Sequence, residues 1–224
     1  MDEMRQEEDS RSKQPIRKRS KKRNLKIPGI FLIILGLGVM AYPFTTSLVN
    51  QGVQKRLRSE WSDKKKNVKL AQTESAGPTG ANNVSSGDPK KDQKAGEPTL
   101  KLIIPGINLN VIVVEGTSPD CLKKGPGHMK KTVLPGEKGV SVISGHRTTH
   151  GAPFFKLGNL RDGDRIIIET MTAQYVFQVY ETKEVSPNDT SFIKPSDESI
   201  LALTTCTPIY SARRRLVILA RLES

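Results

Sequence analysis

The most informative stretch of the sequence is Leu201-Ala202-Leu203-Thr204-Thr205-Cys206-Thr207-Pro208-Ile209-Tyr210-Ser211-Ala212-Arg213-Arg214-Arg215-Leu216. It begins as an apolar and β-branched run, which is typical of a buried strand. Pro208 ends that strand, because proline cannot donate to a sheet ladder. A second apolar run returns over residues 216–220. We therefore expect Cys206 and Arg215 at the same end of two neighbouring strands, with a thiol beside a guanidinium.

The pairing of Cys206 with Arg215 indicates nucleophilic chemistry. A thiol attacks carbonyl carbons as its thiolate, and nearby positive charge favours that form. Arginine does not deprotonate in proteins and cannot serve as the base. An acid–base partner must therefore come from elsewhere, and the chain has only three histidines. His146 follows the strand-like residues 140–143, so we expect it at a strand end as well.

Residues 98–224 carry an all-β pattern. Short apolar or alternating runs follow one another between turns, at residues 100–104, 109–114, 140–144, 165–170, 174–185, 200–205 and 216–222. These runs lie too close together for regular helical crossovers between parallel strands, although residues 154–160 are compatible with one helical turn. The pattern predicts a closed or nearly closed β-barrel of seven or eight strands, and this length suffices for one core.

Two segments of opposite composition precede this domain. Residues 1–26 are polar and rich in charge, and we expect a disordered, basic cytoplasmic tail. Residues 27–44 carry no charge, and a helix over this run would be about 27 Å long, just enough for a bilayer core. We expect a single-pass transmembrane signal anchor over residues 27–49, with the N-terminus inside and the barrel outside. A cleaved signal peptide and a buried helix are the alternatives.

Residues 50–97 are predicted to be an extracellular stalk and flexible linker. The part up to residue 69 is either a short amphipathic helix near the lipid headgroups, with Trp61 as an interfacial residue, or a solvated stalk. Residues 70–97 are rich in Gly, Ser, Pro, Asn and Lys, a composition that gives a disordered tether.

The net charge of +13 argues against a nucleic-acid partner because of where the charge lies. Residues 1–69 carry 17 Lys and Arg against 7 Asp and Glu. Binding to nucleic acid needs a basic face on a folded domain, whereas most of this excess flanks the apolar segment. The basic N-terminal cluster is instead typical of a cytoplasmic membrane flank.

Several short motifs occur in a characteristic order. Leu203-Thr204-Thr205-Cys206 precedes Arg215-Leu216-Val217-Ile218, and Gly145-His146-Arg147 lies upstream of both. Still further upstream are Gly125-Pro126-Gly127-His128, Thr132 and Pro135-Gly136-Glu137. Together these motifs resemble the sortases, the membrane-anchored cysteine transpeptidases of Gram-positive bacteria. The resemblance covers the chain from about residue 100, and residues 146–154 are most similar to the class E type. It implies the sortase form of the β-barrel.

The resemblance implies a role for each central residue. Cys206 is expected to be the nucleophile that forms a thioester, and His146 the general acid and base. Arg215 is expected to hydrogen-bond the substrate and the developing oxyanion. Residue type alone does not decide among the three consecutive arginines, but alternation along the strand points Arg214 away from the side of Arg215. Arg213 and Arg214 would then be solvated loop charges.

Other residues around this centre are expected to assist. Substrate-binding or oxyanion roles are expected for Thr204, Thr205 and His150, and ordinary β-propensity explains Thr205 equally well. His128 is expected to be structural or to line the pocket, and Cys121 to pack as a small hydrophobe. With two cysteines and no ligand spacing around the histidines, we expect no disulfide, no metal site and no cofactor.

By resemblance, the substrate is a surface protein with a sorting signal of the Leu-x-x-Thr-Gly kind. Cleavage between Thr and Gly would leave the Thr as a thioester on Cys206. The acceptor would be an amine of a peptidoglycan precursor of the lipid II kind or, in pilus-building relatives, a lysine of a pilin subunit. Resemblance to class E favours the signal Leu-Ala-x-Thr-Gly.

Two alternatives to this function remain. A pilin-polymerising sortase would often carry an Asp-Pro-aromatic lid before the barrel, whereas Asp88-Pro89 is followed here by Lys90. A catalytically silent barrel that serves as a surface binding or scaffold module is the alternative of another class. The intact set of Cys206, His146 and Arg215 argues against it.

Overall fold

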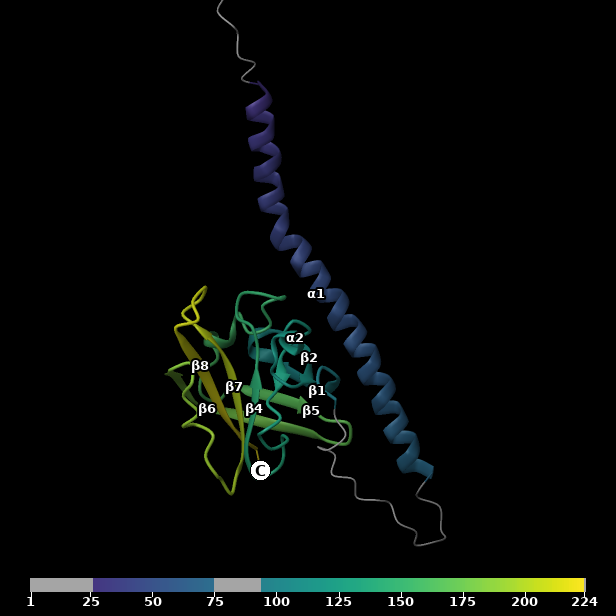
Figure 1. Cartoon of the computed structure of the whole chain (residues 1–224). Helices are drawn as coiled ribbons and strands as arrows, with labels where there is room; N and C mark the ends of the chain where they lie inside the picture. Colours follow the sequence, from purple (N-terminus) through teal and green to yellow (C-terminus); the bar gives the residue numbers. More distant parts are fainter. Residues whose placement is uncertain (1–25, 75–93, 224) are drawn as a thin grey trace, which may run out of the picture. The chain divides into compact units, whose positions relative to one another are not determined.

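The computed structural model describes residues 26–74 and 94–223 (Figure 1). Disorder is expected over residues 1–26 and 70–97, and most of both segments lies outside the described residues. Residues 70–74, however, belong to a helix, so the expected disorder is wrong there. The chain divides into two compact units, Met1–Tyr42 and Pro43–Ser224. Helix α1 (Lys26–Glu74) contributes to both units, and the second unit holds all of the described strands.

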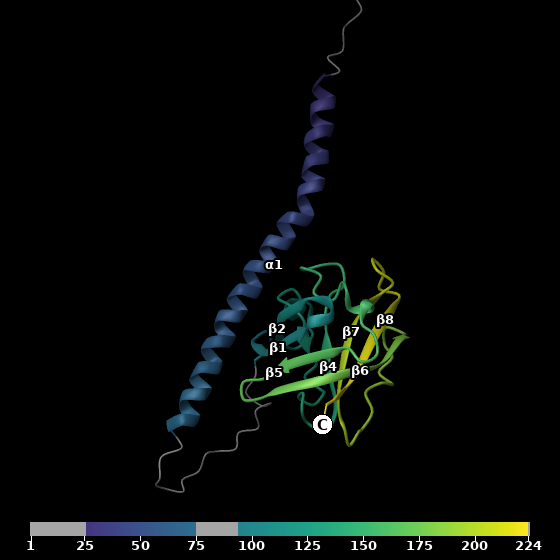
Figure 2. The ribbon, with the colours of Figure 1, turned by 180° about the vertical axis from the view of Figure 1, so that it is seen from behind.

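Eight strands close into one barrel, as the sequence predicts (Figures 1 and 2). Their order is β1-β2-β3-β4-β7-β8-β6-β5, and the pairing of β5 with β1 closes it. The pairs β2–β3 and β4–β7 are parallel, and the other pairs are antiparallel. The strands are β1 (Pro98–Ile104), β2 (Leu109–Glu115), β3 (Gly127–His128), β4 (Gly139–Ser144), β5 (Arg165–Glu169), β6 (Gln174–Val185), β7 (Ser199–Thr207) and β8 (Arg214–Leu222).

All seven strands expected from the sequence are present, together with three short helical segments. The eighth strand, β3, cannot be recognised in the sequence, because two residues cannot show an alternating pattern. The helical turn expected over residues 154–160 is the 3₁₀ turn η2 (Leu157–Asn159). A second 3₁₀ turn, η1 (Pro105–Ile107), joins β1 to β2, and α2 (Pro119–Leu122) precedes β3. Neither segment is long enough to carry a helical period.

The strands β4, β7 and β8 are buried on both faces. On β7, Leu201 and Leu203 pack inside the barrel around Phe154, whereas Ala202 joins a second cluster with Val217 of β8. Successive side chains of a strand point to opposite faces, so a strand covered on both faces reads as a continuous apolar run. This double burial explains why residues 201–205 show no polar alternation.

The second part of α1 packs against the barrel. Leu57 and Trp61 are buried together with Ile112, Val114 and Cys121, and Trp61 is only 6% exposed. The expectation of an interfacial Trp61 or a solvated stalk over residues 50–74 is therefore wrong. The sequence gives no clear sign of this packing. Leu57 and Trp61 are four positions apart and share one helix face, but many charged residues surround them and obscure an amphipathic pattern.

Gln54 of α1 fills the gap between β2 and the segment that leads to β3. Its Oε1 accepts a hydrogen bond from the Ile112 amide at 2.9 Å, and its Nε2 donates to the carbonyls of Lys124 at 2.9 Å and Ile112 at 3.3 Å. The side-chain amide thus bridges two backbones where β3 is too short to pair. A Cβ at Gly125 would lie 2.4 Å from this Nε2, so glycine leaves the space for the bridge.

The first part of α1 covers the segment in which a transmembrane anchor is expected. Among the described helices, none combines the length and the apolar composition that a membrane span requires. Large apolar side chains of this part are exposed, namely Ile30, Leu32, Ile33, Ile34, Leu35, Leu37 and Met40. The membrane anchor over residues 27–49 stays a prediction.

Replacing Gln54 by alanine is expected to lower the free energy of unfolding by about 1–3 kcal/mol, because the buried Ile112 amide loses its acceptor. Urea unfolding measures the loss, and hydrogen exchange of the Ile112 amide shows whether it arises at the bridge. Ser59→Ala, at an exposed position of the same helix, is the matched control and should change neither quantity. Equal exchange rates of the Ile112 amide in the two variants would contradict the bridge.

Candidate active site

Cys206 and Arg215 face each other across neighbouring strands. Cys206 lies near the end of β7 and pairs directly with Arg215 near the start of β8. The Nη1 of Arg215 donates to the Cys206 Sγ at 3.4 Å, and it also lies 3.2 Å from the Ala212 carbonyl oxygen. Cys206 is half-buried. The structure thus brings together the thiol and the guanidinium that the sequence places at one end of two strands.

The two side chains share a face of the sheet. Ala202 and Val217 belong to the cluster that packs on the outside of the barrel. Cys206 follows Ala202 by an even number of residues, and Arg215 precedes Val217 by an even number. Because side chains alternate along a strand, Cys206 and Arg215 lie on this same outer face, at the open end of the two strands.

The parallel pairing of β4 with β7 brings His146 level with Cys206. The register pairs Ser144 with Thr204, and the Gly145 amide donates to the Thr204 carbonyl at 3.0 Å. The same register, continued by two residues, sets His146 beside Cys206. The site therefore combines the ends of three adjacent strands, with β4 on one side of β7 and β8 on the other.

Thr204 and Thr205 join β7 to β4 through their hydroxyl groups. The Oγ1 of Thr205 donates to the Gly145 carbonyl at 2.8 Å, and the hydroxyls of Thr204 and Ser144 share a hydrogen bond of 2.8 Å. A Cβ at Gly145 would lie 2.7 Å from the buried ring of Phe154, which explains the glycine before the histidine. Both threonine hydroxyls are engaged inside the fold, so they hold the two strand ends together.

His146 and His150 form a stacked pair. Their ring centroids are 4.8 Å apart, and the ring planes are inclined by 27°. Burial lowers the pKa of His146 below the ordinary value of a histidine, and the charge of His150 lowers it further. The His146 imidazole is therefore mainly neutral at neutral pH, and its imidazolium form is a stronger acid than that of an exposed histidine.

Arg147 also belongs to this site, although the sequence alone suggests no role for it. Its Nη1 donates to the carbonyl oxygen of Cys206 at 3.1 Å. A Cβ at Gly158, in the turn η2, would lie 2.8 Å from its Nη2. The guanidinium thus fills the space between the end of β7 and η2. Its position directly after His146 in the Gly-His-Arg motif is the signal that could have identified it.

The other two arginines of the triplet have different surroundings. The Nη2 of Arg214 donates to the Glu184 carbonyl at 2.8 Å, and its Nε lies 3.5 Å from the Glu184 carboxylate. Thr207 donates to the same carboxylate at 3.1 Å. Arg213 is exposed in the loop before β8. Arg215 is thus the arginine of the triplet that contacts the thiol, as strand alternation predicts.

His128 is fully buried beside Glu115. Its Nδ1 lies 3.1 Å from the Glu115 carboxylate, and its Nε2 lies 3.0 Å from the Val133 carbonyl. A carbonyl only accepts, so Nε2 is the donor in its contact with Val133. Both ring nitrogens are engaged, which agrees with the structural role expected for His128. Cys121 is buried in the cluster around Trp61, in agreement with a packing role.

A thiol in contact with a guanidinium, beside a histidine that follows a parallel strand, is the geometry expected from the motifs. A comparison with protein families gives the same answer, because the sortase domain model matches residues 102–223. This chain belongs to the sortase family. It is therefore an enzyme of the cysteine transpeptidase type. Sortases are associated with the membrane and cell wall, and they act on surface proteins that carry sorting signals and on amine nucleophiles.

Individual relatives extend the match beyond the barrel. Sortase D of Bacillus subtilis (strain 168) is 33% identical over 198 residues, which cover 86% of this sortase and 96% of the relative. The structure of sortase E from Streptomyces avermitilis is 32% identical with a TM-score of 0.53, and the match covers 58% of this sortase and 91% of that chain. A Clostridium perfringens sortase D5 transpeptidase, at 24% identity, shares the fold with a TM-score of 0.60 over 80% of this sortase and all of that chain (100%).

Removing the charge of His150 is expected to raise the pKa of His146, because a neighbouring cation disfavours the imidazolium form. In the His150→Asn variant the pKa should move towards the ordinary value without reaching it, since burial is the larger cause and remains. Titration of the His146 ring resonances by NMR measures this pKa directly. Lys183→Gln, which removes a charge on β6, is the control and should leave the titration unchanged. A pKa of His146 that stays constant or falls in His150→Asn would contradict the assigned electrostatics.

Proposed function

We propose that this sortase cleaves a Leu-x-x-Thr-Gly sorting signal between Thr and Gly, with a preference for Leu-Ala-x-Thr-Gly. The contact between the Arg215 guanidinium and the Cys206 thiol carries the proposal. It joins a nucleophile to a donor for the developing oxyanion. The parallel β4–β7 register adds His146 as the acid and base. Class E is supported by the resemblance of residues 146–154 and by the similarity to a sortase E structure.

In the first half-reaction, Cys206 becomes acylated. The Cys206 thiol gives its proton to neutral His146, and the neighbouring guanidinium favours the resulting thiolate. The thiolate sulfur then attacks the carbonyl carbon of the Thr residue in the signal. Arg215 donates hydrogen bonds to the carbonyl oxygen as it becomes an oxyanion. Collapse of this intermediate breaks the C–N bond between Thr and Gly, and the His146 imidazolium gives its proton to the departing amine. The lowered pKa of His146 makes this proton transfer easier.

In the second half-reaction, the thioester passes to an amine. Neutral His146 takes a proton from the incoming amine while its nitrogen attacks the thioester carbonyl carbon. The C–S bond breaks, and Cys206 leaves as a thiolate that is ready for another cycle. We propose that the amine belongs to a peptidoglycan precursor of the lipid II kind. Arg147, Thr204 and Thr205 act as positioning residues, since they bind the backbone around Cys206 or tie β7 to β4.

We further propose that residues 27–49 anchor the protein in the cell membrane. The run of residues 27–44 carries no charge and follows a basic cluster, and large apolar side chains of this part of α1 are exposed. A denser positive charge before the span favours a cytoplasmic N-terminus. The barrel would then lie outside the membrane, on the side of the sorting signals and the cell wall.

The two alternatives have less support. Residues 88–90, where a pilin-polymerising sortase would carry its lid, read Asp88-Pro89-Lys90 without an aromatic residue, and they lie outside the described residues. A silent scaffold barrel would not need a thiol in contact with an arginine at the end of a strand.

Cys206→Ala should abolish thioester formation, because no other group of the site can hold the acyl chain. The full-length sortase is incubated with peptides that contain Leu-Ala-x-Thr-Gly, Leu-Pro-x-Thr-Gly or a scrambled signal, and the acyl-enzyme is detected by mass spectrometry. His146→Ala should lose nearly all of it, since the departing amine finds no acid.

Cys121→Ala is the matched cysteine control and should keep the thioester. Retention of the thioester in Cys206→Ala together with its loss in Cys121→Ala would refute the assignment of the nucleophile. A stronger signal with Leu-Pro-x-Thr-Gly than with Leu-Ala-x-Thr-Gly would overturn only the class E preference.

Arg215→Ala should lower kcat/KM by about 100-fold or more, as the loss of one oxyanion donor typically does. Arg215→Lys should restore little, because an ammonium group cannot reproduce the planar guanidinium fork. Arg213→Ala and Arg214→Ala are the neighbouring controls and should cost much less, since exposed charges contribute little. Steady-state kinetics with the preferred peptide gives kcat/KM for each variant. An inactive Arg214→Ala together with a nearly normal Arg215→Ala would contradict the assignment of Arg215 as the oxyanion donor.

A further inference from the structure

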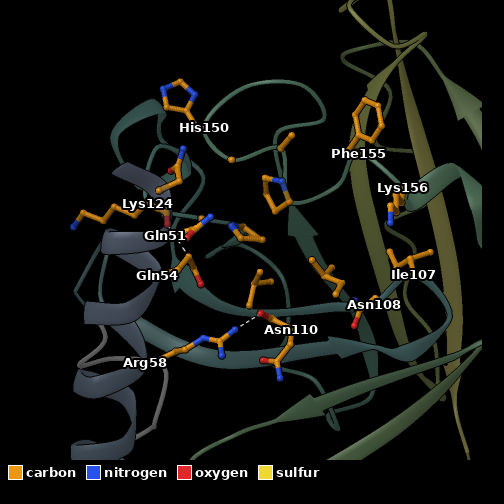
Figure 3. A pocket seen from close by; sticks show the side chains of 18 residues that line it. Gln51, Gln54, Arg58, Ile107, Asn108, Asn110, Lys124, His150, Phe155 and Lys156 are labelled. Carbon is orange, nitrogen blue, oxygen red and sulfur yellow. Dashed lines mark hydrogen bonds between the residues drawn. The ribbon is translucent and has the colours of Figure 1, made fainter. Parts of the chain in front are cut away.

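A pocket of about 410 Å³ lies between α1 and the barrel, within the second unit of the chain (Figure 3). Four segments line it: α1, the connection from η1 into β2, the residues before β3, and the loop after β4. Figure 3 shows Arg58 of α1 reaching across to Asn110, to whose carbonyl oxygen it donates a hydrogen bond. Cys206 and Arg215 are not part of the lining.

The lining of this pocket is cationic and rich in amides. Arg58 and Lys156 line it together with His150, and the lining contains no aspartate or glutamate. Lys124 also lines it, but its Nζ donates to the Gly96 carbonyl at 3.2 Å. Side-chain amides of Asn108 and Asn110 add neutral donors and acceptors. Amide and guanidinium donors without a competing carboxylate favour an anionic, oxygen-rich ligand.

The pocket is next to the catalytic histidine, on the side away from Arg215. Its rim includes His150, whose ring stacks on that of His146. His146 follows β4 and Arg215 lies on β8, and these two strands flank β7 on opposite sides. The oxyanion of the first half-reaction would therefore meet Arg215 on one side, and an incoming amine would meet His146 on the other.

We propose that this pocket is the subsite for an anionic group of the amine acceptor, either a phosphate or a carboxylate. The inference rests on the proposed function and specifies where its second substrate binds. The Arg58 guanidinium of α1 and the Lys156 amino group of the loop after β4 hold the anion, while the amine of the same molecule reaches the thioester beside His146. Phosphate groups occur in lipid-linked precursors and carboxylates in peptide acceptors, and both present the charged oxygens that these donors bind.

Because the acceptor enters only the second half-reaction, the pocket should matter for aminolysis and not for thioester formation. The full-length sortase is acylated with the preferred peptide, and the decay of the thioester is followed with three amines. Triglycine carries a carboxylate, its C-terminal amide is neutral, and the diglycine amide of phosphoethanolamine carries a phosphate. The variant is Arg58→Gln with Lys156→Gln. The matched control is Lys123→Gln, a lysine paired with Asp120 outside the lining.

The double variant should acylate at the normal rate but react at least about tenfold more slowly with an anionic amine, since charge-assisted hydrogen bonds are lost. It should react normally with the neutral amide, and Lys123→Gln should behave as the unmodified sortase with all three amines. A loss confined to the phosphate amine identifies a phosphate-bearing acceptor, and a loss confined to triglycine identifies a carboxylate-bearing one.

Equal effects on neutral and anionic amines, or no effect on either, would overturn the anion subsite. If the double variant acylates slowly, the addition of inorganic pyrophosphate to the unmodified sortase provides a second test. Pyrophosphate should shift the NMR resonances of His150 and slow aminolysis by the anionic amines without slowing acylation, and the absence of both effects would also overturn the subsite. Failure of the unmodified sortase to form any thioester would instead overturn the proposed function, which is a distinct result.

Discussion

The active centre depends on the parallel pairing of β4 with β7. These strands come from separate parts of the chain, and their register pairs Ser144 with Thr204. Continued by two residues past the end of β4, this register brings His146 level with Cys206. The pairing is reinforced at its open end by the Thr205 hydroxyl, which is bound to the Gly145 carbonyl. A register shift of one residue would move each side chain to the other face of its strand. Because both strands are buried on both faces, their register is strongly specified. The same burial therefore fixes the relative positions of His146 and Cys206.

The electrostatics of the centre follow from this arrangement. Arg215 contacts the thiol from β8, and a guanidinium cannot lose its proton, so it supplies constant positive charge. The pKa of His146 is lowered by burial of its ring and, to a smaller extent, by the charge of His150. In the proposed mechanism, Arg215 stabilises negative charge on sulfur and oxygen, and His146 carries the proton. Arg147 supports this division from behind by binding the Cys206 carbonyl.

From Pro43 onward, helix α1 is part of the folded second unit. Leu57 and Trp61 cover the outer face of β2, and Gln54 bridges the gap beside β3. The same helix lines the cationic pocket through Arg58. A segment whose composition predicts a stalk thus packs on the barrel and lines a cavity together with His150.

The sequence by itself determined the all-β class, the seven longer strands, and the pairing of Cys206 with Arg215. These features are local or concern adjacent strands, and apolar or alternating runs between turns indicate them directly. Only the tertiary structure decided the two-residue strand β3, the role of Arg147, and the docking of Gln54 and Trp61 on the barrel. The physical reason is that each of these depends on contacts between segments far apart in the chain. Gln54, for example, forms hydrogen bonds with Ile112 and Lys124. The pattern of residues within 50–69 contains no information about these backbone groups, which lie 58 and 70 positions away in the sequence.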